Sequence, residues 1–461
     1  MPMTTWVTPE EIEIEGERIP LLKKLFWAYF LLLFFEGALR KWVVPQLSME
    51  LLLIRDPIAL AILWEAYRTR KWPHEWTEVI GVLTLALFVL FFLQVIVLGF
   101  PWYIALFGLR SYLLPFPVTF VMGKNLDYED LRKFARFTLW LTLPLTALQV
   151  AQYYAPSDSF LNRGAGIGAS QITYTGVHVR ASATFSFVTG PIHYMPLAAG
   201  FILYALINRE FIKPRILVWL SAAAVLIAIP ITGSRSIVYE LGVLFVMCPF
   251  AALSGVTQVK RTLQALAVIV IVALGVGQLP MFSESMQSLA RRFSEASGSE
   301  GDTQTAVEGR TFEPITQSLD SALTSSAWLG QGMGYGSNLA ARTLTGEVGF
   351  LAGETEWPRV IAEFGPFFGV AFMMFRAVLA LFLISRAIAR LREHQSLAWL
   401  LIVATIPALA IEILEQPTIQ GFLVVTLGFM LAALNRENFE PQDFVYEDMP
   451  VYLQHFESGA R

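Results

Sequence analysis

Long apolar blocks separated by short polar connections dominate the chain. Residues 79–109 contain no charged side chain, and neither do residues 216–234, 241–259 and 262–283. A bilayer core about 30 Å thick needs roughly 20 apolar residues per helix. In lipid, every backbone N–H and C=O must be bonded within its segment, so these blocks predict helices. The pattern predicts twelve segments, at residues 22–38, 49–67, 77–98, 102–122, 133–153, 186–207, 215–232, 236–253, 262–280, 359–385, 397–414 and 418–434.

Composition excludes an ordinary soluble domain. Of the 461 residues, 55% are hydrophobic and only 15% are charged, against roughly 25% charged in soluble proteins. A membrane β-barrel would show short alternating segments, and the sequence has none. The single cysteine, Cys248, lies in an apolar block and suits packing better than chemistry. The predicted fold class is an all-α integral membrane protein with about twelve transmembrane helices.

Positive residues predict the topology. They concentrate in one set of alternate loops, at residues 68–71, 124–136, 209–215, 260–261 and 386–392. The other set is poor in positive residues, with Arg40 and Lys41 as the main exception among its short loops. Such loops face the cytoplasm, and an even number of spans then places both termini there. We expect a cytoplasmic segment at 1–21, a membrane domain at 22–434 and a cytoplasmic tail at 435–461. The acidic N-terminus resembles no cleavable signal peptide, so the first span must act as its own insertion signal.

Two long loops are predicted on the opposite side. The first covers about residues 155–184, and the second, between the ninth and tenth helices, covers 281–358. The second loop starts with a Gly/Ser-rich stretch at 294–301, continues with an amphipathic helix at 312–323 and contains a glycine-dense turn at 330–336. A loop of this length is usually functional or disordered, and its aromatic and aliphatic residues favour a packed loop.

Four arginines fall on that opposite side: Arg180, Arg235, Arg310 and Arg359. Arg235 is the most informative, because it lies in a tight Gly-Ser turn between two apolar helices, where positive residues are scarce. A guanidinium can hold a diphosphate by bidentate, charge-assisted hydrogen bonds without a metal. The alternative is an arginine that binds ordinary lipid headgroups.

Charges inside or beside the predicted spans form a second set of candidates. Intramembrane charges are costly and tend to be functional, although a structural ion pair explains each one equally well when it is taken singly. The set consists of Arg55, Asp56, Arg110, Glu240, Glu412 and Glu415. The five histidines are scattered, and the sequence has no metal-ligand signature, no Walker A element and no GxGxxG element. We therefore expect no cofactor and no nucleic-acid partner.

Several segments, in order, resemble the O-antigen ligase/polymerase superfamily of bacterial membrane glycosyltransferases. They are Gly108-Leu-Arg-Ser-Tyr, Arg180-Ala-Ser-Ala-Thr-Phe, Thr232-Gly-Ser-Arg-Ser, Glu308-Gly-Arg310, Gly330-Gln-Gly-Met-Gly and the segment from Glu354 to Gly365. The resemblance covers roughly residues 100–380. In the second element Ala183 replaces the glycine of the family. The resemblance to this superfamily implies a bacterial inner membrane protein whose long loop 281–358 is periplasmic.

The resemblance further implies a polysaccharide polymerase that joins undecaprenyl-diphosphate-linked oligosaccharide units in O-antigen or exopolysaccharide synthesis. Membrane lipids and other polysaccharide assembly proteins are the further partners it implies. One departure is that Glu354 stands where the ligases have a histidine, which favours a polymerase. Alternatives are ligase-type transfer to a lipid or protein acceptor, a lipid-linked glycan flippase or transporter, and a non-catalytic assembly partner.

Under this interpretation each candidate residue has an expected role. Glu354 deprotonates the acceptor hydroxyl, and Glu356 is held in reserve for that step. Arg235 and Arg180 stabilise the charge that gathers on the leaving diphosphate. Substrate binding is assigned to Arg310, Arg359, Glu356, Arg110 and Trp357, the last as an interfacial anchor or a platform for a sugar.

Overall fold

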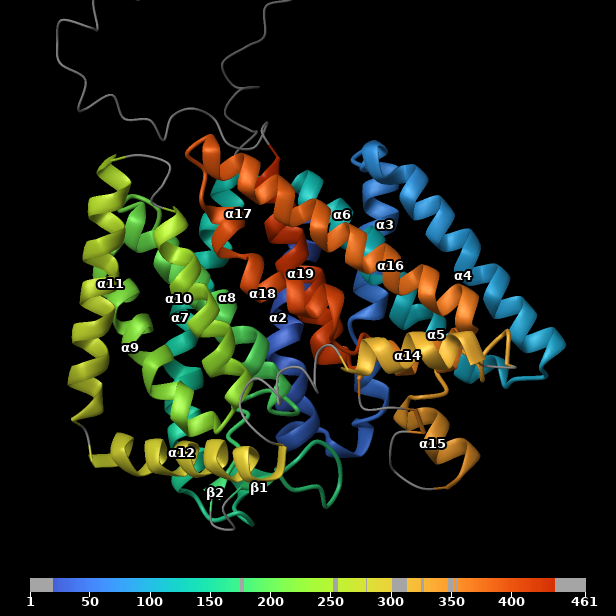
Figure 1. The fold of residues 1–461 in the computed structure, drawn as a ribbon, viewed down its shortest axis with the longest axis horizontal. Coiled ribbons are helices and arrows are strands. Elements are labelled where there is room, and N and C mark those ends of the chain that lie inside the picture. Colours follow the sequence, from blue (N-terminus) through green and yellow to red (C-terminus); the bar gives the residue numbers. More distant parts are fainter. Residues whose placement is uncertain are drawn as a thin grey trace, which may run out of the picture.

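The computed structural model describes residues 20–174, 178–251, 256–278, 280–300, 313–324, 327–346, 351–352 and 355–435. Every one of the twelve predicted segments is largely helical (Figure 1). The helices are α2 (Leu21–Ala38), α3 (Asp56–Arg68), α4 (Thr77–Val97), α5 (Trp102–Leu113), α6 (Pro115–Asn125), α7 (Tyr128–Tyr154), α8 (Thr189–Ile207), α9 (Arg215–Thr232), α10 (Arg235–Ala251), α11 (Val256–Gly277), α16 (Glu356–Arg392), α17 (Leu397–Leu400), α18 (Ile402–Ala410) and α19 (Pro417–Leu434).

Eight helical stretches in the described part of the chain are long and apolar enough to cross a membrane. They are formed by α4, α5 with α6, α7, α8, α9, α11, α16 and α19. The other four predicted segments contain shorter or more charged helices: α3 has 13 residues, α10 has 17, α18 has 9, and α2 carries Lys23, Lys24 and Glu36. The chain is thus a multi-pass α-helical membrane protein, while the count of twelve spans stays a prediction.

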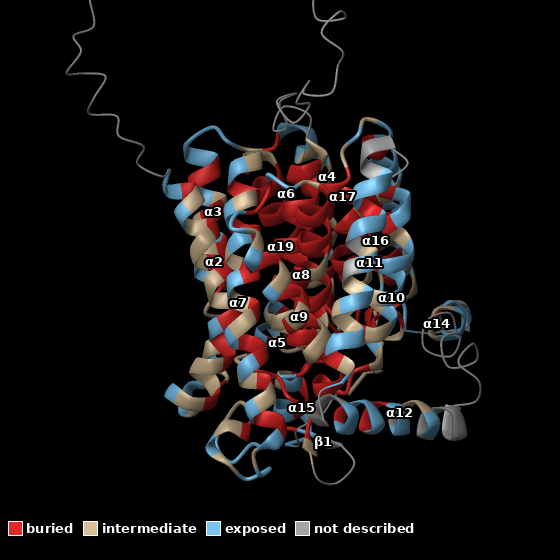
Figure 2. Cartoon of the chain, turned by 90° about the vertical axis from the view of Figure 1, so that its left-hand side faces the viewer, coloured by how far each residue is buried: buried red, intermediate tan, exposed pale blue. Residues whose placement is uncertain are grey.

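Burial separates a central group of helices from a peripheral one. In α8, 94% of the apolar 18-residue stretch is buried inside the protein, against 12% in α11. Helix α8 therefore forms part of the core, whereas the apolar side chains of α11 are left to contact lipid. Figure 2 shows the buried residues concentrated along α6, α8 and α19. Gly123 lies against Leu431, and Gly428 against Met122. These small residues let α6 and α19 approach closely, as is common between membrane helices.

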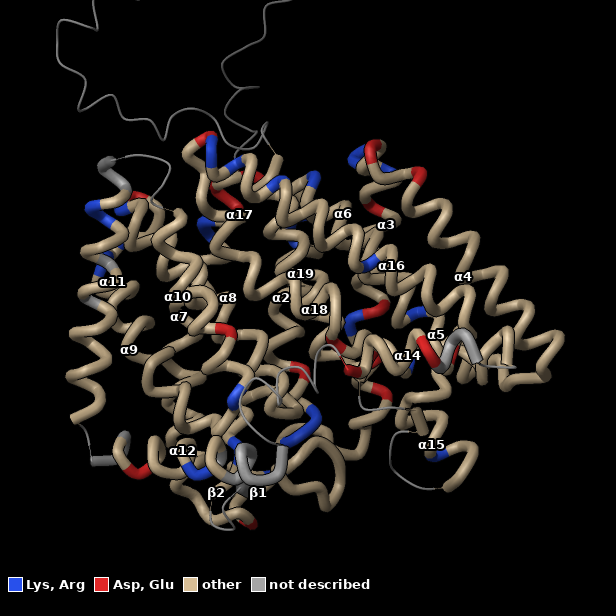
Figure 3. The backbone as a smooth tube through the Cα atoms, in the orientation of Figure 1, with Lys and Arg blue, Asp and Glu red and all other residues tan. Residues whose placement is uncertain are grey.

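One end of the bundle is rich in lysine and arginine (Figure 3). There, Lys124, Arg386 and Arg390 line a small cavity together with the last turn of α19. Asp127 caps α7 and pairs with Lys23, their side-chain atoms being 2.7 Å apart. Although partial burial opposes it, the hydrogen bond from Lys23 lowers the pKa of Asp127. We call this the cationic end.

At the opposite end, the predicted loops contain secondary structure. Between α7 and α8, a two-residue hairpin pairs β1 (Thr173–Tyr174) with β2 (His178–Val179). The stretch predicted to be a Gly/Ser-rich loop, up to residue 300, instead belongs to α12 (Pro280–Glu300), which lies across the end of the bundle in Figure 1. Ser285, Ser288 and Leu289 are buried, and this spacing is that of one helical face.

The predicted amphipathic helix at 312–323 is confirmed as α14 (Glu313–Thr324). It is followed by the glycine-dense turn at 330–336, which we call the glycine turn, and by α15 (Asn338–Leu344).

Short irregular helices complete the fold. Four 3₁₀ helices lie at Pro45–Leu47, Glu50–Leu53, His74–Trp76 and Phe160–Asn162 in the described part of the chain. A single π-helical turn at Leu39–Val43 extends α2.

Helix α16 is broken inside its apolar run. Gly365 has φ 79° and ψ 170°, and Pro366 follows it. A side chain at this position would lie 2.2 Å from the carbonyl oxygen of Trp328, so only glycine allows the approach. The break therefore seats the start of the glycine turn against the first part of α16.

Candidate functional site

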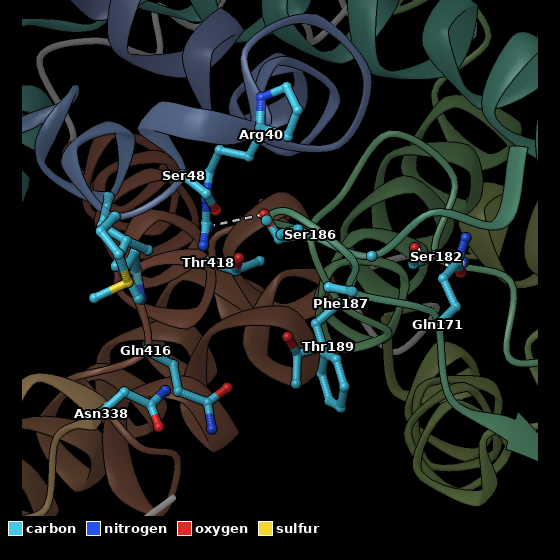
Figure 4. A pocket seen from close by; sticks show the side chains of 18 of the residues that line it. Arg40, Ser48, Gln171, Ser182, Ser186, Phe187, Thr189, Asn338, Gln416 and Thr418 are labelled. Carbon is cyan, nitrogen blue, oxygen red and sulfur yellow. Dashed lines mark hydrogen bonds between the residues drawn. The ribbon is translucent and has the colours of Figure 1, made fainter. Parts of the chain in front are cut away.

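A cavity of about 730 Å³ opens among the loops at the end opposite the cationic end. Its walls come from the connection between α2 and α3, the loop before α8, the start of α15 and the starts of α16 and α19 (Figure 4). Among the described residues, its charged lining consists of four arginines and one glutamate: Arg40, Arg180, Arg342, Arg359 and Glu415. A space lined in this way favours an anionic ligand.

Hydroxyl and amide side chains occupy much of the remaining wall. Figure 4 shows Ser48, Gln171, Ser182, Ser186, Thr189, Asn338, Gln416 and Thr418 around the cavity. Such groups both donate and accept hydrogen bonds. The cavity can therefore bind a ligand that carries several hydroxyl groups as well as negative charge.

Glu415, the acidic residue of the charged cavity lining, lies in the short segment between α18 and α19. Proline at the first position of a helix is favourable and forces the preceding residue into an extended conformation. Pro417 holds this position in α19, and Gln416 is extended. The chain therefore turns at the cavity wall, where Glu415 and Gln416 both line it.

Glu415 and Arg359 form a buried ion pair. Arg359 donates from Nη1 to Glu415 Oε2 at 3.0 Å and to the carbonyl of Gly336 at 3.1 Å. In the described part of the chain, Glu415 Oε1 has no hydrogen-bond partner. Burial raises the pKa of Glu415 to about 7, with Arg359 acting in the opposite direction. The carboxylate can thus exchange a proton near neutral pH.

Arg40 connects the cavity to a second ion-pair cluster. It donates to Ser186 Oγ at 2.9 Å and to Ser48 Oγ at 3.2 Å, and it pairs with Glu36 at 3.2 Å. The other carboxylate oxygen of Glu36 accepts from Arg55 at 3.0 Å. Arg55 also donates to the carbonyl of Pro417. This cluster fixes Arg40 and the start of α19 relative to each other.

Glu363 and Gln94 hold the glycine turn. Glu363 accepts from the backbone N–H groups of Gly334 and Gly336 at 3.0 and 2.7 Å. Gln94 accepts from the N–H of Met333 at 2.8 Å and donates to the carbonyl of Leu329 at 2.7 Å. Since Gly336 in turn accepts from Arg359, the turn belongs to the support of the cavity.

We expect Gly108→Ala to destabilise this support. A Cβ at Gly108 would lie 2.3 Å from the backbone nitrogen of Gly334, so α5 and the turn would have to separate. Overpacking of this kind costs about 1–3 kcal/mol of unfolding free energy. The matched control is Gly81→Ala in α4, where a Cβ meets nothing within 4 Å. Thermal unfolding in one detergent measures both, and equal midpoints would contradict the close approach.

The structure brings two predicted site residues, Arg180 and Arg359, to the same cavity. Arg110 pairs with Asp56 at 3.1 Å and stacks on Phe107, which lines the cavity. Arg235 is the first residue of α10 and is not part of the lining.

Two further predicted residues are buried away from the cavity. Glu356 is fully buried, pairs with Arg376 and accepts from the N–H of Leu414 at 3.3 Å. The neighbouring Trp357 is also buried. Neither side chain lines the cavity. Glu354 and Arg310 lie outside the described residues.

Three of the five charged lining residues had no assigned role in the sequence interpretation. Arg40 stood out only as an exception to the topology pattern, and Glu415 only as one of several intramembrane charges. Arg342 gave no signal, because it lies in a helix of only seven residues, α15, within the long predicted loop. The signal available in the sequence was an unusual position of charge. Arg40 is a cation in a loop on the side that is poor in cations, and Glu415 is an acid directly beside a predicted span.

The chain matches no sequence model of a known protein family, and no curated protein matches it. The fold and the cavity together define a multi-pass helical membrane protein with an arginine-lined site at one end of its bundle. Guanidinium groups bind phosphate and diphosphate through charge-assisted hydrogen bonds. The chemistry open to this site is therefore the binding of a phosphorylated ligand beside a carboxylate that can accept a proton.

Proposed function

We propose that the chain is a metal-independent glycosyltransferase of the polysaccharide polymerase type. It joins undecaprenyl-diphosphate-linked oligosaccharide units at the periplasmic face of the bacterial inner membrane. The observation that carries the proposal is the cavity in which Arg40, Arg180, Arg342 and Arg359 accompany one buried carboxylate, Glu415. The order of motifs resembling the ligase/polymerase superfamily supports the same function.

The proposed reaction is a substitution at the anomeric carbon of the donor. An acceptor hydroxyl forms the new bond to that carbon while the bond to the lipid diphosphate breaks. The hydroxyl proton passes to Glu415, and the undecaprenyl diphosphate leaves with the bonding electron pair. Arg180, Arg342 and Arg40 stabilise the negative charge that grows on it, which lowers the barrier. Arg359 holds Glu415 in place through the 3.0 Å hydrogen bond.

Glu415 replaces Glu354 as the first candidate for the general base. Its support is geometric: it lines the cavity beside the arginines, and its Oε1 makes no hydrogen bond within the described residues. Glu354 remains the alternative, because its position in the chain is only five residues before Arg359.

The pH dependence of turnover tests this assignment. A general base must be deprotonated to act, and burial raises the pKa of Glu415 to about 7. We therefore expect kcat/KM for chain extension to be low at pH 5, to rise through about pH 7 and to level off above it. Extension rates of purified protein between pH 5 and 9 measure the profile. A profile already flat from pH 5 upward would contradict a base with this pKa.

The proposed topology has twelve spans, with the cationic end in the cytoplasm and the cavity in the periplasm. Loops rich in lysine and arginine face the cytoplasm, and Arg386 and Lys124 lie at the cationic end. We expect alkaline phosphatase fused at Ser297 to be active and a fusion at His394 to be inactive. Green fluorescent protein fused at the same two sites should give the opposite pattern. Phosphatase activity at His394 would overturn this topology.

A lipid-linked glycan transporter is the second candidate function. The break of α16 at Gly365 favours it, since interrupted helices are common at the substrate sites of transporters. The two candidates differ in products: a polymerase releases undecaprenyl diphosphate and lengthens the glycan, whereas a transporter changes neither covalently.

A further inference from the structure

The turn that carries Arg180 into the cavity is strained. Ala183 adopts φ 51°, in the left-handed region that a residue with a Cβ disfavours. The residue is also fully buried. On either side of it, Ser182 and Ser186 line the cavity (Figure 4). Arg180 lines it as well. Something must hold this turn against its preference to relax.

Lys41 makes the contacts that can do so. Its Nζ donates to Ser182 Oγ, to the carbonyl of Ala183 and to the carbonyl of Phe185, each at 2.8 Å. From the other side, Gln152 accepts from the N–H of Ala183 at 2.8 Å and donates to its carbonyl at 3.2 Å. All three protons of the Lys41 ammonium group are thus directed to the turn, which Gln152 holds from the other side.

The neighbouring residues of α2 are adapted to the same contact. Arg40, directly before Lys41, donates to Ser186 at the far end of the turn. One helical turn earlier, a Cβ at Gly37 would lie 2.3 Å from the backbone nitrogen of Ser186. The π-helical turn at Leu39–Val43 brings Arg40 and Lys41 to this surface, and such irregular turns are frequent at functional sites.

A buried ammonium is an expensive way to fill this space. Lys41 is only 1% exposed, and within the described residues it forms hydrogen bonds to neutral groups and no ion pair. Burial lowers its pKa to about 7. An apolar side chain would pack here without the desolvation cost, so packing alone does not account for a lysine.

We propose that Lys41 is a positioning residue: through the turn at Ser182–Phe185 it sets the place of Arg180 and Ser186 in the cavity. The inference rests on the proposed function only in that the positioned groups act on a diphosphate-linked donor. The positioning itself is a property of the fold and can be measured without substrate.

The test uses Lys41→Met, which keeps an unbranched side chain only one atom shorter and removes the three donors. The full chain is reconstituted in lipid nanodiscs, and hydrogen–deuterium exchange is followed across residues 180–186. We expect exchange there to become at least tenfold faster, with helix α8 unchanged. The matched control is Lys24→Met, an exposed lysine on helix α2, which the π-helical turn with Lys41 extends. Unchanged exchange in Lys41→Met would overturn the proposal.

A second substitution separates positioning from direct contact with substrate. Adding Ala183→Gly to Lys41→Met removes the strain of the left-handed conformation at position 183. The turn then no longer needs Lys41 to hold it. Exchange protection and chain extension should then recover together by several fold relative to the single variant. Absence of recovery in both would mean that Lys41 does not act through the strained turn. If protection recovers while the native protein extends no glycan, the proposed function fails and the positioning role stands.

Discussion

Replacing Glu415 with glutamine is expected to lower the rate of chain extension by about 10²- to 10⁴-fold, the usual contribution of a positioned general base. Glutamine keeps the shape of the side chain and can still accept a hydrogen bond from Arg359, but it cannot take the proton of an acceptor hydroxyl. Extension of a labelled undecaprenyl-diphosphate oligosaccharide by purified protein in nanodiscs, followed on gels, gives the rate.

Two variants control for the loss of the ion pair. Glu415→Asp keeps the charge and shortens the reach, so its thermal midpoint should stay nearer the native value while its rate falls. Glu129→Gln removes a carboxylate that pairs with Arg132 at the surface, at 2.9 Å, and should change neither property. An unimpaired Glu415→Gln together with an inactive Glu354→Gln would transfer the role of base to Glu354.

Replacing Arg180 with alanine is expected to lower kcat/KM for extension by about 10²- to 10³-fold. A donor aimed at developing charge contributes this much in other enzymes, and Arg180 lines the cavity beside Ser182. Lysine at this position should restore little activity, because a point charge cannot copy the bidentate fork of a guanidinium. The KM for the donor should rise as kcat falls, since the diphosphate is present in both substrate and leaving group.

The same loop offers a matched control. Arg163 stacks on Phe160 and is exposed, and it does not line the cavity. Its alanine variant should extend glycan normally. Arg235→Ala is informative by comparison, because the motif resemblance gives Arg235 a role while the cavity does not include it. A larger loss in Arg235→Ala than in Arg180→Ala would move the diphosphate site away from the cavity.

The helical segments could be predicted because the membrane imposes one strong rule. Apolar blocks such as 79–109 and 216–234 can satisfy their backbone only as helices. The sequence was less informative in the long polar loop, where that rule does not apply. Residues 294–300 look like a Gly/Ser-rich loop, yet they continue α12, whose buried face is set by packing on the end of the bundle.

Two of the five charged lining residues could be anticipated, and the reason is local in each case. Arg180 and Arg359 belong to recognisable motifs in polar stretches. Glu415 and Arg40 become neighbours of these residues only through the fold, since Arg40 lies 140 positions before Arg180 and Glu415 lies 56 after Arg359. Single-sequence patterns carry no information about such long-range contacts.

The motif resemblance also gains a physical reading from the structure. Ala183, which stands where the family has glycine, adopts the left-handed conformation that glycine accepts most easily. Glu363 and Gly365, near the end of the last motif, hold the glycine turn and break α16. Glu363 and Gly365 therefore have structural reasons for their residue types, and position 183 has one for the glycine of the family, independent of any reaction.

One reconstitution tests the central claim most directly. The full chain is placed in liposomes with an undecaprenyl-diphosphate oligosaccharide that carries a fluorescent label on its glycan. Gels then report glycan length, and a membrane-impermeant quencher reports the leaflet in which the label lies. The polymerase account predicts a ladder of longer glycans with release of undecaprenyl diphosphate, both lost in Glu415→Gln and Arg180→Ala. Movement of the label between leaflets, with no change in glycan length, would contradict it.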